Sequence, residues 1–223
     1  ACVKHYAGYG APIAGRDYNV VDMTERTLRE VYLPPYKAAV EEGAWTVMTS
    51  FNEIDGTPAT ANSWLLEDVL RGEWKFKGMV VSDYTSVNEM VNHGNVANEK
   101  EAGEAALNAG LDMDMQGAVF QNHLAKSVQE GKVKMVQIDE AVRRILRLKH
   151  QLGLFENPYK YCDEERERRV VLSQANQDAA RDVARKSVVL LKNDNVLPLS
   201  KNLGSVAVIG PLADDKDQMI GAW

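Results

Sequence analysis

The sequence predicts an α/β fold with a parallel sheet, namely the second half of a (β/α)8 TIM-type barrel. Between residue 1 and about residue 155, short apolar stretches alternate with amphipathic stretches of helical period. Each apolar stretch ends in a polar or charged residue, as parallel strands do at the edge that carries a site. Four such strand–helix units are half of an eight-stranded barrel. We therefore expect two open sheet edges and a missing half that lies upstream.

The first unit begins with a strand over residues 2–6 that contains Lys4 and His5. A glycine-rich connection over residues 7–21 follows. Thr24 has the character of a helix N-cap, so a helix is expected to open there. Pro34 and Pro35 cannot donate backbone hydrogen bonds and should break this helix. A second helical stretch over residues 36–42 is expected to end at Gly43.

The next two units are read in the same way. Residues 45–51 predict a strand, Asp55-Gly56 a turn, and residues 63–74 a helix with an apolar face. Residues 78–84 then give a glycine, three apolar residues and an abrupt Ser82-Asp83. This pattern is typical of a buried parallel strand that delivers one carboxylate to its C-terminal edge.

The last unit begins after a polar loop over residues 88–100, in which His93 is expected to be solvated. A helix at about 101–109 leads to a fourth strand over residues 111–115. The best helical period of the chain covers residues 138–152.

Three segments are predicted along the chain: a half barrel over 1–155, a linker over 156–200, and the start of a second α/β domain over 201–223. The linker contains a charge run over 163–169, a helix over 174–185 and a strand-like stretch over 187–191. The second domain is expected to open with a buried strand over 205–209. The chain is therefore interpreted as a piece of a longer protein.

Composition narrows the class of partner. The formal net charge is -6 without a basic stripe, which argues against nucleic acid as a partner. No apolar run approaches the length of a membrane span, so no membrane partner is expected. Cys2 and Cys162 lack the spacing of a zinc motif, and whether they form a disulfide is left open.

The four strand ends should meet at one rim of the sheet. That rim would hold an ammonium, an imidazole, a carboxylate and aromatic faces, which suits a polyhydroxylated, uncharged ligand such as a sugar. Lys4 would keep a nearby Asp ionised, as a carboxylate nucleophile requires.

Each of these residues also has a structural interpretation. Asp83 could cap a helix that begins near Thr85. Lys4 and His5 could be a solvated strand end, and Met48 could belong to the core. Asp112 and Asp114 could be interior or capping residues, an interpretation favoured over catalysis. For Arg16 and Asp17, the structural interpretation is a local ion pair that orders the glycine-rich loop.

Several motifs resemble glycoside hydrolase family 3, and in particular its periplasmic bacterial β-glucosidase branch. The resemblance covers essentially the whole chain in order. The matching segments are residues 4–7, 15–19, 47–52, 56–59, 81–84, 153–155, 189–193 and 209–214.

The resemblance implies a retaining exo-glycosidase that hydrolyses terminal β-D-glucosyl residues without a cofactor or metal. Asp83 would be the nucleophile that forms a covalent glycosyl-enzyme intermediate. The expected substrate-binding residues are Lys4, His5, Arg16, Met48, Phe51 and Tyr84. The implied location is the periplasm, and the implied second domain is an α/β sandwich.

The resemblance also implies that the acid/base residue lies outside this chain. The β-glucosidase branch takes a Glu from its second domain, downstream of residue 223. The N-acetylglucosaminidase branch uses a His in the loop after the Lys-His pair, but that position is Tyr9 here and the preceding Pro of its pattern is Ala7. The glucosaminidase branch is therefore disfavoured.

Two other functions stay open. A β-xylosidase of the same family is the nearest rival, because pocket detail decides between the two sugars. A catalytically dead carbohydrate-binding or structural fragment is the alternative from another class. An oligosaccharide or β-glucoside is the expected partner, and exposed barrel edges are expected to favour a homo-oligomer or instability in isolation.

Overall fold

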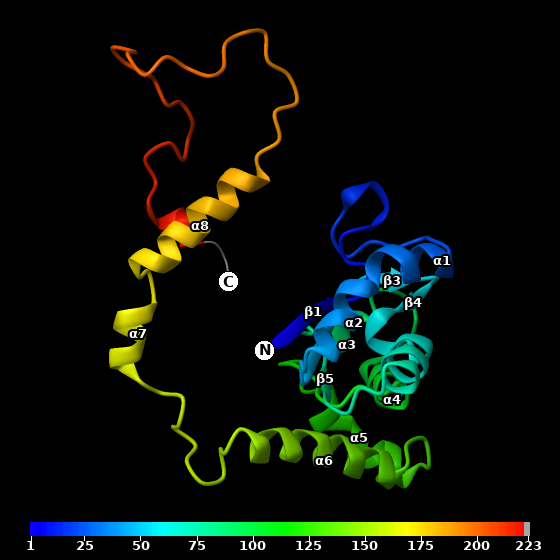
Figure 1. Ribbon diagram of the computed structural model, residues 1–223. Helices are drawn as coiled ribbons and strands as arrows, with labels where there is room; N and C mark the ends of the chain where they lie inside the picture. Colours follow the sequence, from blue (N-terminus) through cyan, green and yellow to red (C-terminus); the bar gives the residue numbers. More distant parts are fainter. Residues whose placement is uncertain (221–223) are drawn as a thin grey trace. The chain divides into compact units, whose positions relative to one another are not determined.

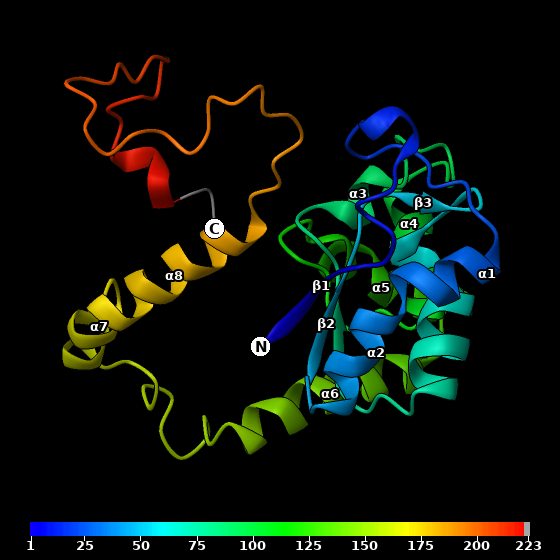
Figure 2. The same cartoon turned by 45° about the horizontal axis from the view of Figure 1, so that its top comes forward.

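The computed structural model describes residues 1–220 and divides into two compact units (Figures 1 and 2). The first unit spans Ala1–Cys162 and the second begins at Asp163. The last three residues of the segment predicted to start a second domain, 221–223, lie outside the described residues.

A parallel three-stranded sheet forms the centre of the first unit. Its strands are β1 (Cys2–Tyr6), β2 (Thr46–Thr49) and β5 (Met79–Val81), in the spatial order β1-β2-β5. Val3 pairs with Val47, and Val47 pairs with Val80. All three strands predicted in this part of the chain are confirmed, and their carboxyl ends lie at one edge because the strands are parallel.

Helices connect the strands. α1 (Glu25–Thr27) opens after Thr24, whose hydroxyl accepts the N–H of Thr27 at 3.2 Å, which confirms the predicted N-cap. The π-helical segment η2 (Leu28–Tyr32) continues it, and α2 (Pro34–Glu41) follows after Leu33 alone. The predicted break at the prolines is therefore confirmed, although the second helix begins at Pro34 rather than at residue 36. Both prolines lie in the first turn of α2, where a missing N–H costs nothing.

The rest of the first unit surrounds this frame. The antiparallel pair β3 (Glu53–Ile54) and β4 (Thr57–Pro58) forms the predicted turn, and η1 (Ile13–Gly15) and η3 (Ala59–Ala61) are short 3₁₀ turns. The π-helical η4 (Trp64–Glu73) occupies the predicted helix. The remaining helices are α3 (Ser86–Glu89), α4 (Glu99–Asn108), α5 (Val119–Gln129) and α6 (Met135–Gln151).

The larger of two hydrophobic clusters joins the sheet to η4 and its neighbours. Tyr6, Val47 and Val80 of the sheet are buried together with Leu65 and Leu70 of η4. The phenol of Tyr6 donates a hydrogen bond to the carbonyl of Leu65 at 3.1 Å, so the ring is buried without an orphaned hydroxyl. The core therefore fixes the strand that carries His5.

The predicted fourth strand over residues 111–115 is wrong. This segment forms no ladder with β5: the pairing is a single isolated bridge between Val81 and Met113, and the N–H groups of Asp112 and Met113 both donate to the carbonyl of Val80. The two aspartates explain why, because their carboxylates take backbone N–H groups of other segments. Asp112 accepts from Val80 at 2.8 Å, and Asp114 accepts from Val119 at the start of α5 at 2.6 Å. Both therefore have the structural roles that the sequence favoured.

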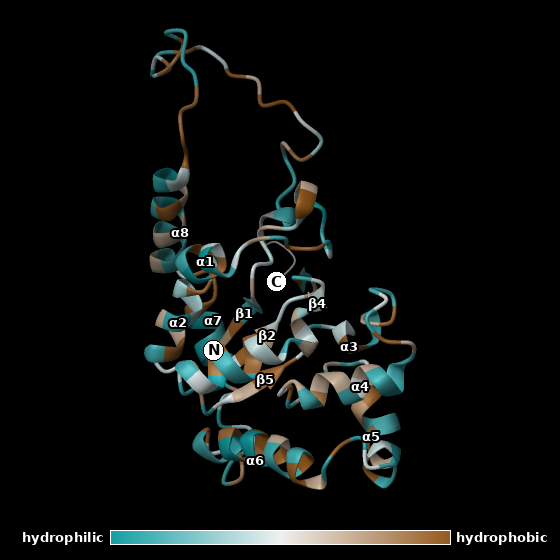
Figure 3. Cartoon of the chain, turned by 90° about the vertical axis from the view of Figure 1, so that its right-hand side faces the viewer, coloured by the Kyte–Doolittle hydropathy of each residue, from teal (hydrophilic) through white to brown (hydrophobic). Residues whose placement is uncertain are grey.

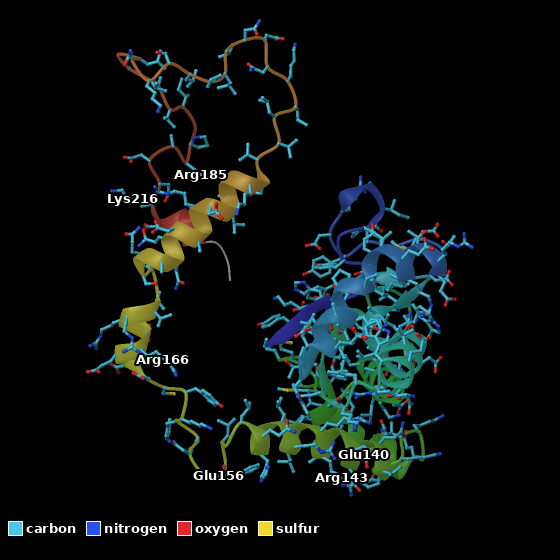
Figure 4. The ribbon with its side chains drawn as sticks, viewed as in Figure 1. Glu140, Arg143, Glu156, Arg166, Arg185 and Lys216 are labelled. Carbon is cyan, nitrogen blue, oxygen red and sulfur yellow. The ribbon has the colours of Figure 1, made fainter. Side chains whose placement is uncertain are left out.

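Asp112 also anchors α6 to the sheet. Its side chain is fully buried between two guanidinium groups, with Arg71 of η4 and Arg144 of α6 each at 2.7 Å. On the outer side of α6, Glu140 and Arg143 form an exposed ion pair at 2.9 Å (Figure 4). Hydrophilic and hydrophobic residues mix along this helix (Figure 3).

The second unit consists of helices and extended chain. α7 (Glu164–Val170) contains the predicted charge run, α8 (Gln174–Ser187) the predicted helix, and η5 (Asp217–Ile220) is a short 3₁₀ turn. Arg166 of α7 and Arg185 of α8 are exposed (Figure 4). The strands expected over 187–191 and 205–209 are absent from the described part of this unit. Apolar residues there are exposed, and no neighbouring strand supplies a ladder of hydrogen bonds.

Two further findings complete the fold. Cys2 and Cys162 are both exposed free thiols. Within residues 1–220, no helix has both the length and the apolarity that crossing a bilayer requires. The formation of a homo-oligomer through the open edges of the sheet stays a prediction.

The close contact between β2 and β5 can be tested at Gly78. A Cβ at this position would lie 2.2 Å from the carbonyl oxygen of Trp45, which accepts the N–H of Met79. Backbone must move to make room, so Gly78→Ala should lower the free energy of unfolding by about 2 kcal/mol or more in urea denaturation.

Gly10→Ala is the matched control. A Cβ at Gly10 meets no atom within 4 Å, so this variant should stay within about 0.5 kcal/mol of the wild type. Equal stability of the two variants would contradict the packing argument.

Candidate active site

Asp83 lies just beyond the end of β5, and Ser82 fixes its backbone. The N–H of Ser82 donates to the carbonyl of Met113 at 2.9 Å. The Ser82 hydroxyl accepts the N–H of Met115 at 2.8 Å and donates to the carbonyl of Asp83 at 2.9 Å. Ser82 is fully buried, so these bonds hold the turn after β5 against the 113–115 segment.

The Asp83 carboxylate is buried and only half satisfied. The residue is 6% exposed, and its Oδ1 accepts the N–H of Tyr84 at 2.7 Å. Among the described residues, its Oδ2 has no hydrogen-bond partner, and it lies 3.3 Å from Nε2 of His5. One oxygen is therefore anchored while the other keeps its lone pairs for a ligand.

The helix-capping interpretation of Asp83 is wrong. α3 begins at Ser86, whose N–H donates to the backbone carbonyl of Asp83 at 3.1 Å. Within residues 1–220, the hydrogen bond that the carboxylate itself accepts comes from the adjacent Tyr84 and not from the first turn of α3. Asp83 thus shapes the turn through its backbone and leaves its side chain to the site.

His5 projects from β1 next to this carboxylate. Its own carbonyl accepts a hydrogen bond from the Tyr36 phenol of α2, which ties the strand end to that helix. Burial lowers the pKa of the His5 imidazole, the negative charge of Asp83 opposes this, and the Lys4 ammonium lowers it further. Lys4 is exposed, so it acts on the site here through its charge.

A row of aromatic rings extends from His5. The His5 and Tyr9 rings meet edge to face at 5.1 Å between centroids, Tyr9 lies 5.9 Å from Phe51, and Phe51 lies 4.5 Å from Tyr18. We call these four residues the aromatic row. Such rings offer the apolar faces against which the C–H faces of sugars pack.

Carboxylates lie along the same row. The pKa of the Tyr9 phenol is raised, first by burial and then by the Asp17 carboxylate. Glu89, at the end of α3, accepts a hydrogen bond from the Thr85 hydroxyl at 3.1 Å. Burial raises the pKa of Glu89, and the charge of Asp83 adds to this shift.

A hollow of about 360 Å³ opens beside the row and is lined by Tyr18, Glu89, Asn92 and His93. The expectation of a solvated His93 is wrong. Its side chain is 14% exposed, and its Nδ1 lies 2.8 Å from Oε1 of Glu53 on β3. The pairing with a carboxylate from a distant hairpin explains its burial.

The structure brings together some of the residues proposed from sequence. His5 contacts Asp83, Phe51 joins through Tyr9, and Met48 is half-buried in β2 opposite Val81. Tyr84 is 57% exposed and anchors Asp83 through its N–H. Arg16 is exposed in the 7–21 connection, and the expected ion pair with Asp17 does not form within the described residues.

Sequence reasoning missed four residues around Asp83: Tyr9, Asp17, Tyr18 and Glu89. Three of them lie in the glycine-rich connection, where no period identifies the direction of a side chain. The two tyrosines, in a loop otherwise rich in small residues, were the sequence signal that this loop contributes to the site.

Comparison with known proteins identifies the class to which this site belongs. Residues 1–148 match the N-terminal domain of glycosyl hydrolase family 3. Since the match covers well over half of the chain, the chain belongs to this family.

The relatives are glycosidases. A periplasmic β-glucosidase of Salmonella typhimurium is 44% identical over 99% of this chain and 29% of its own length. A β-xylosidase of Formosa agariphila is 38% identical over 100% of this chain and 32% of its own length. The chain thus spans about a third or less of these relatives.

Solved structures agree. The crystal structure of a β-glucosidase from Listeria innocua in complex with glucose superposes with a TM-score of 0.81 at 46% identity, over 90% of this chain and 28% of that one. An exo-β-xylosidase of the same family, in complex with a xylobiose aziridine probe, gives a TM-score of 0.80 at 33% identity.

The contact between His5 and Asp83 predicts how the pKa of His5 responds to substitution of Asp83. The pKa of His5 should lie below 6.5, and Asp83→Asn should lower it further, because the carboxylate that favours the imidazolium is gone. Histidine NMR titration measures both values. Glu41→Gln, on the exposed side of α2, should leave the pKa of His5 unchanged.

The same shift has a consequence for stability. The unfolded chain binds a proton at His5 near pH 6.5, before the folded chain does. The free energy of unfolding should therefore fall as the pH drops below about 6.5 and through the folded pKa. A His5 pKa that rises in Asp83→Asn would contradict the assigned contact.

Proposed function

We propose that this chain supplies the nucleophile and part of the sugar pocket of a retaining exo-β-glucosidase. The observation that supports this most strongly is the buried carboxylate of Asp83, with one anchored oxygen and one oxygen left free beside His5. The substrates would be oligosaccharides or β-glucosides with a terminal, non-reducing β-D-glucosyl residue.

The chemistry assigned to Asp83 is a double displacement. Its free oxygen attacks the anomeric carbon, the bond from that carbon to the glycosidic oxygen breaks, and an acid gives its proton to the leaving oxygen. Water, deprotonated by the same group, then attacks the anomeric carbon and releases Asp83. His5 and Lys4 would bind hydroxyls of the sugar, and Met48, Phe51, Tyr84 and Arg16 would line its surroundings.

The acid/base is proposed to come from outside these 223 residues. In a retaining enzyme the second carboxyl lies about 5–5.5 Å from the nucleophile. The negative charge of Asp83 contributes to the raised pKa of Glu89. Glu89, however, lines the hollow beside the aromatic row, and we assign it to binding there rather than to proton transfer. The family resemblance instead implies a Glu from a second domain.

The proposed context of the site follows from the same resemblance. Residues 1–155 would form the second half of a (β/α)8 barrel, and residues from 201 onward would begin an α/β sandwich. The periplasmic relative supports a periplasmic location. No metal or organic cofactor is assigned to the reaction.

A β-xylosidase is the second candidate, because xylosidases of the family are also similar to this chain. The two sugars differ by one hydroxymethyl group. The ratio of kcat/KM for aryl β-glucoside and aryl β-xyloside in the full-length protein decides between them, and we expect the glucoside to be preferred.

The role of Asp83 is tested by trapping. Incubation of the full-length protein with 2-deoxy-2-fluoro-β-glucosyl fluoride should leave a fluoroglucosyl ester on Asp83, mapped by peptide mass spectrometry, because the fluorine slows release of the intermediate. Asp83→Asn should lose the adduct and about 10⁴-fold in kcat. An adduct on another carboxylate would overturn the assignment.

The need for an outside acid/base makes a separate prediction. The purified 223-residue chain should show negligible hydrolysis of aryl β-glucosides, measured by release of the phenol, because protonation of the leaving oxygen lacks its donor. Turnover comparable to that of the full-length protein would refute the assignment of the acid/base to another segment.

A further inference from the structure

The hollow beside the aromatic row has no assigned ligand. We propose that it receives the leaving group of the substrate, and that Glu89 makes it select leaving groups with an amine, such as amino sugars or amino alcohols, over acidic ones. This inference rests on the proposed glycosidase function and specifies the leaving-group side of the same site.

Contacts connect the hollow to the proposed nucleophile. Tyr18 lines the hollow and packs on Phe51 at 4.5 Å, and the row continues through Tyr9 to His5, which lies 3.3 Å from Asp83. A ligand whose sugar lies over His5 and Asp83 therefore has a continuous aromatic surface that leads toward the hollow.

Carboxylates from separate segments act electrostatically on Tyr18, which lines the hollow. The pKa of its phenol is raised by burial first, and then by the negative charges of Glu89, Asp17 and Asp83. Asp17 belongs to the 7–21 connection, Asp83 follows β5, and Glu89 belongs to α3. All three act on one ring at the mouth of the hollow.

Among the lining residues, Glu89 provides the negative charge without a basic partner in hydrogen-bond contact. Its bond comes from the neutral hydroxyl of Thr85 at 3.1 Å. His93, the other ionisable lining residue besides Tyr18, lies 2.8 Å from Glu53. Its charge also acts on Glu89, where it opposes the rise in pKa that burial causes. Asn92 is neutral. Lys4 and His5 lie on β1, at the other end of the aromatic row.

The charge pattern determines which leaving groups fit. An ammonium on the leaving group gains attraction to Glu89 and can donate to its carboxylate. A carboxylate on the leaving group meets like charge, and repulsion of the wrong ligand is a common source of specificity. A neutral hydroxyl is intermediate. Glu89 is thus a specificity-determining residue rather than the acid/base.

Three matched substrates test this in the full-length protein: 2-aminoethyl, 2-hydroxyethyl and carboxymethyl β-D-glucosides. The measured quantity is kcat/KM at pH 8, compared between the wild type and Glu89→Gln for each substrate. The comparison within one substrate cancels differences in leaving-group reactivity. We expect the variant to lose about fivefold on the amine relative to the hydroxyl, and to gain about fivefold on the acid.

A second variant and a control complete the design. Glu89→Lys should reverse the order and favour the acid, while Glu41→Gln on α2 should leave all three ratios unchanged. If Glu89→Gln changes kcat/KM by the same factor for all three substrates, the inference is overturned. Hydrolysis of these substrates by the wild type would still support the glycosidase function. No hydrolysis of any of them by the wild type would reject both.

Discussion

The parallel pairing of β1, β2 and β5 is the constraint on which the site depends. It brings His5, at the end of β1, to the same edge as Asp83, which follows β5. Hydrogen bonds of Ser82 then fix the turn in which Asp83 lies. The core beneath, with Tyr6 bonded to η4, holds β1 in register. A shift of one residue would turn His5 to the other face of the sheet.

Burying the Asp83 carboxylate is unfavourable unless its charge is compensated. The N–H of Tyr84 and the nearby His5 compensate it in part, and Oδ2 stays without a hydrogen bond. This differs from Asp112, which is also buried but is satisfied by two arginines and the N–H of Val80. Asp83 follows β5 and Asp112 lies in the segment beside β5, yet Asp112 is saturated by the protein while Asp83, within residues 1–220, keeps one oxygen without a hydrogen bond. This contrast supports a chemical role for Asp83 and a structural one for Asp112.

The sequence predicted those parts of the fold that depend on local pattern. The apolar runs of β1, β2 and β5, the Thr24 cap and the polar ending at Asp83 are all visible in it, and all were found. Features that depend on distant partners were not predictable. The His93 side chain is largely removed from solvent because Glu53 of a distant hairpin pairs with it. Residues 111–115 form no strand because Asp112 takes the N–H of Val80 and Asp114 that of Val119. The direction of Tyr9 and Tyr18 depends on a glycine-rich loop, for which no periodicity exists.

The site separates its charges along the aromatic row. The basic groups Lys4 and His5 lie on β1 next to Asp83, while Glu89 lies in the hollow near Tyr18. A nucleophile must stay ionised, and the ammonium of Lys4, the residue before His5, favours this through its charge. The pKa of Glu89 is raised, first by burial and then by the negative charge of Asp83. That cost is explained if Glu89 acts on the part of the substrate that leaves, because an amine there would restore the balance of charge only in the complex. The charge of Glu89 would then be unfavourable in the empty site and favourable once a basic leaving group is bound.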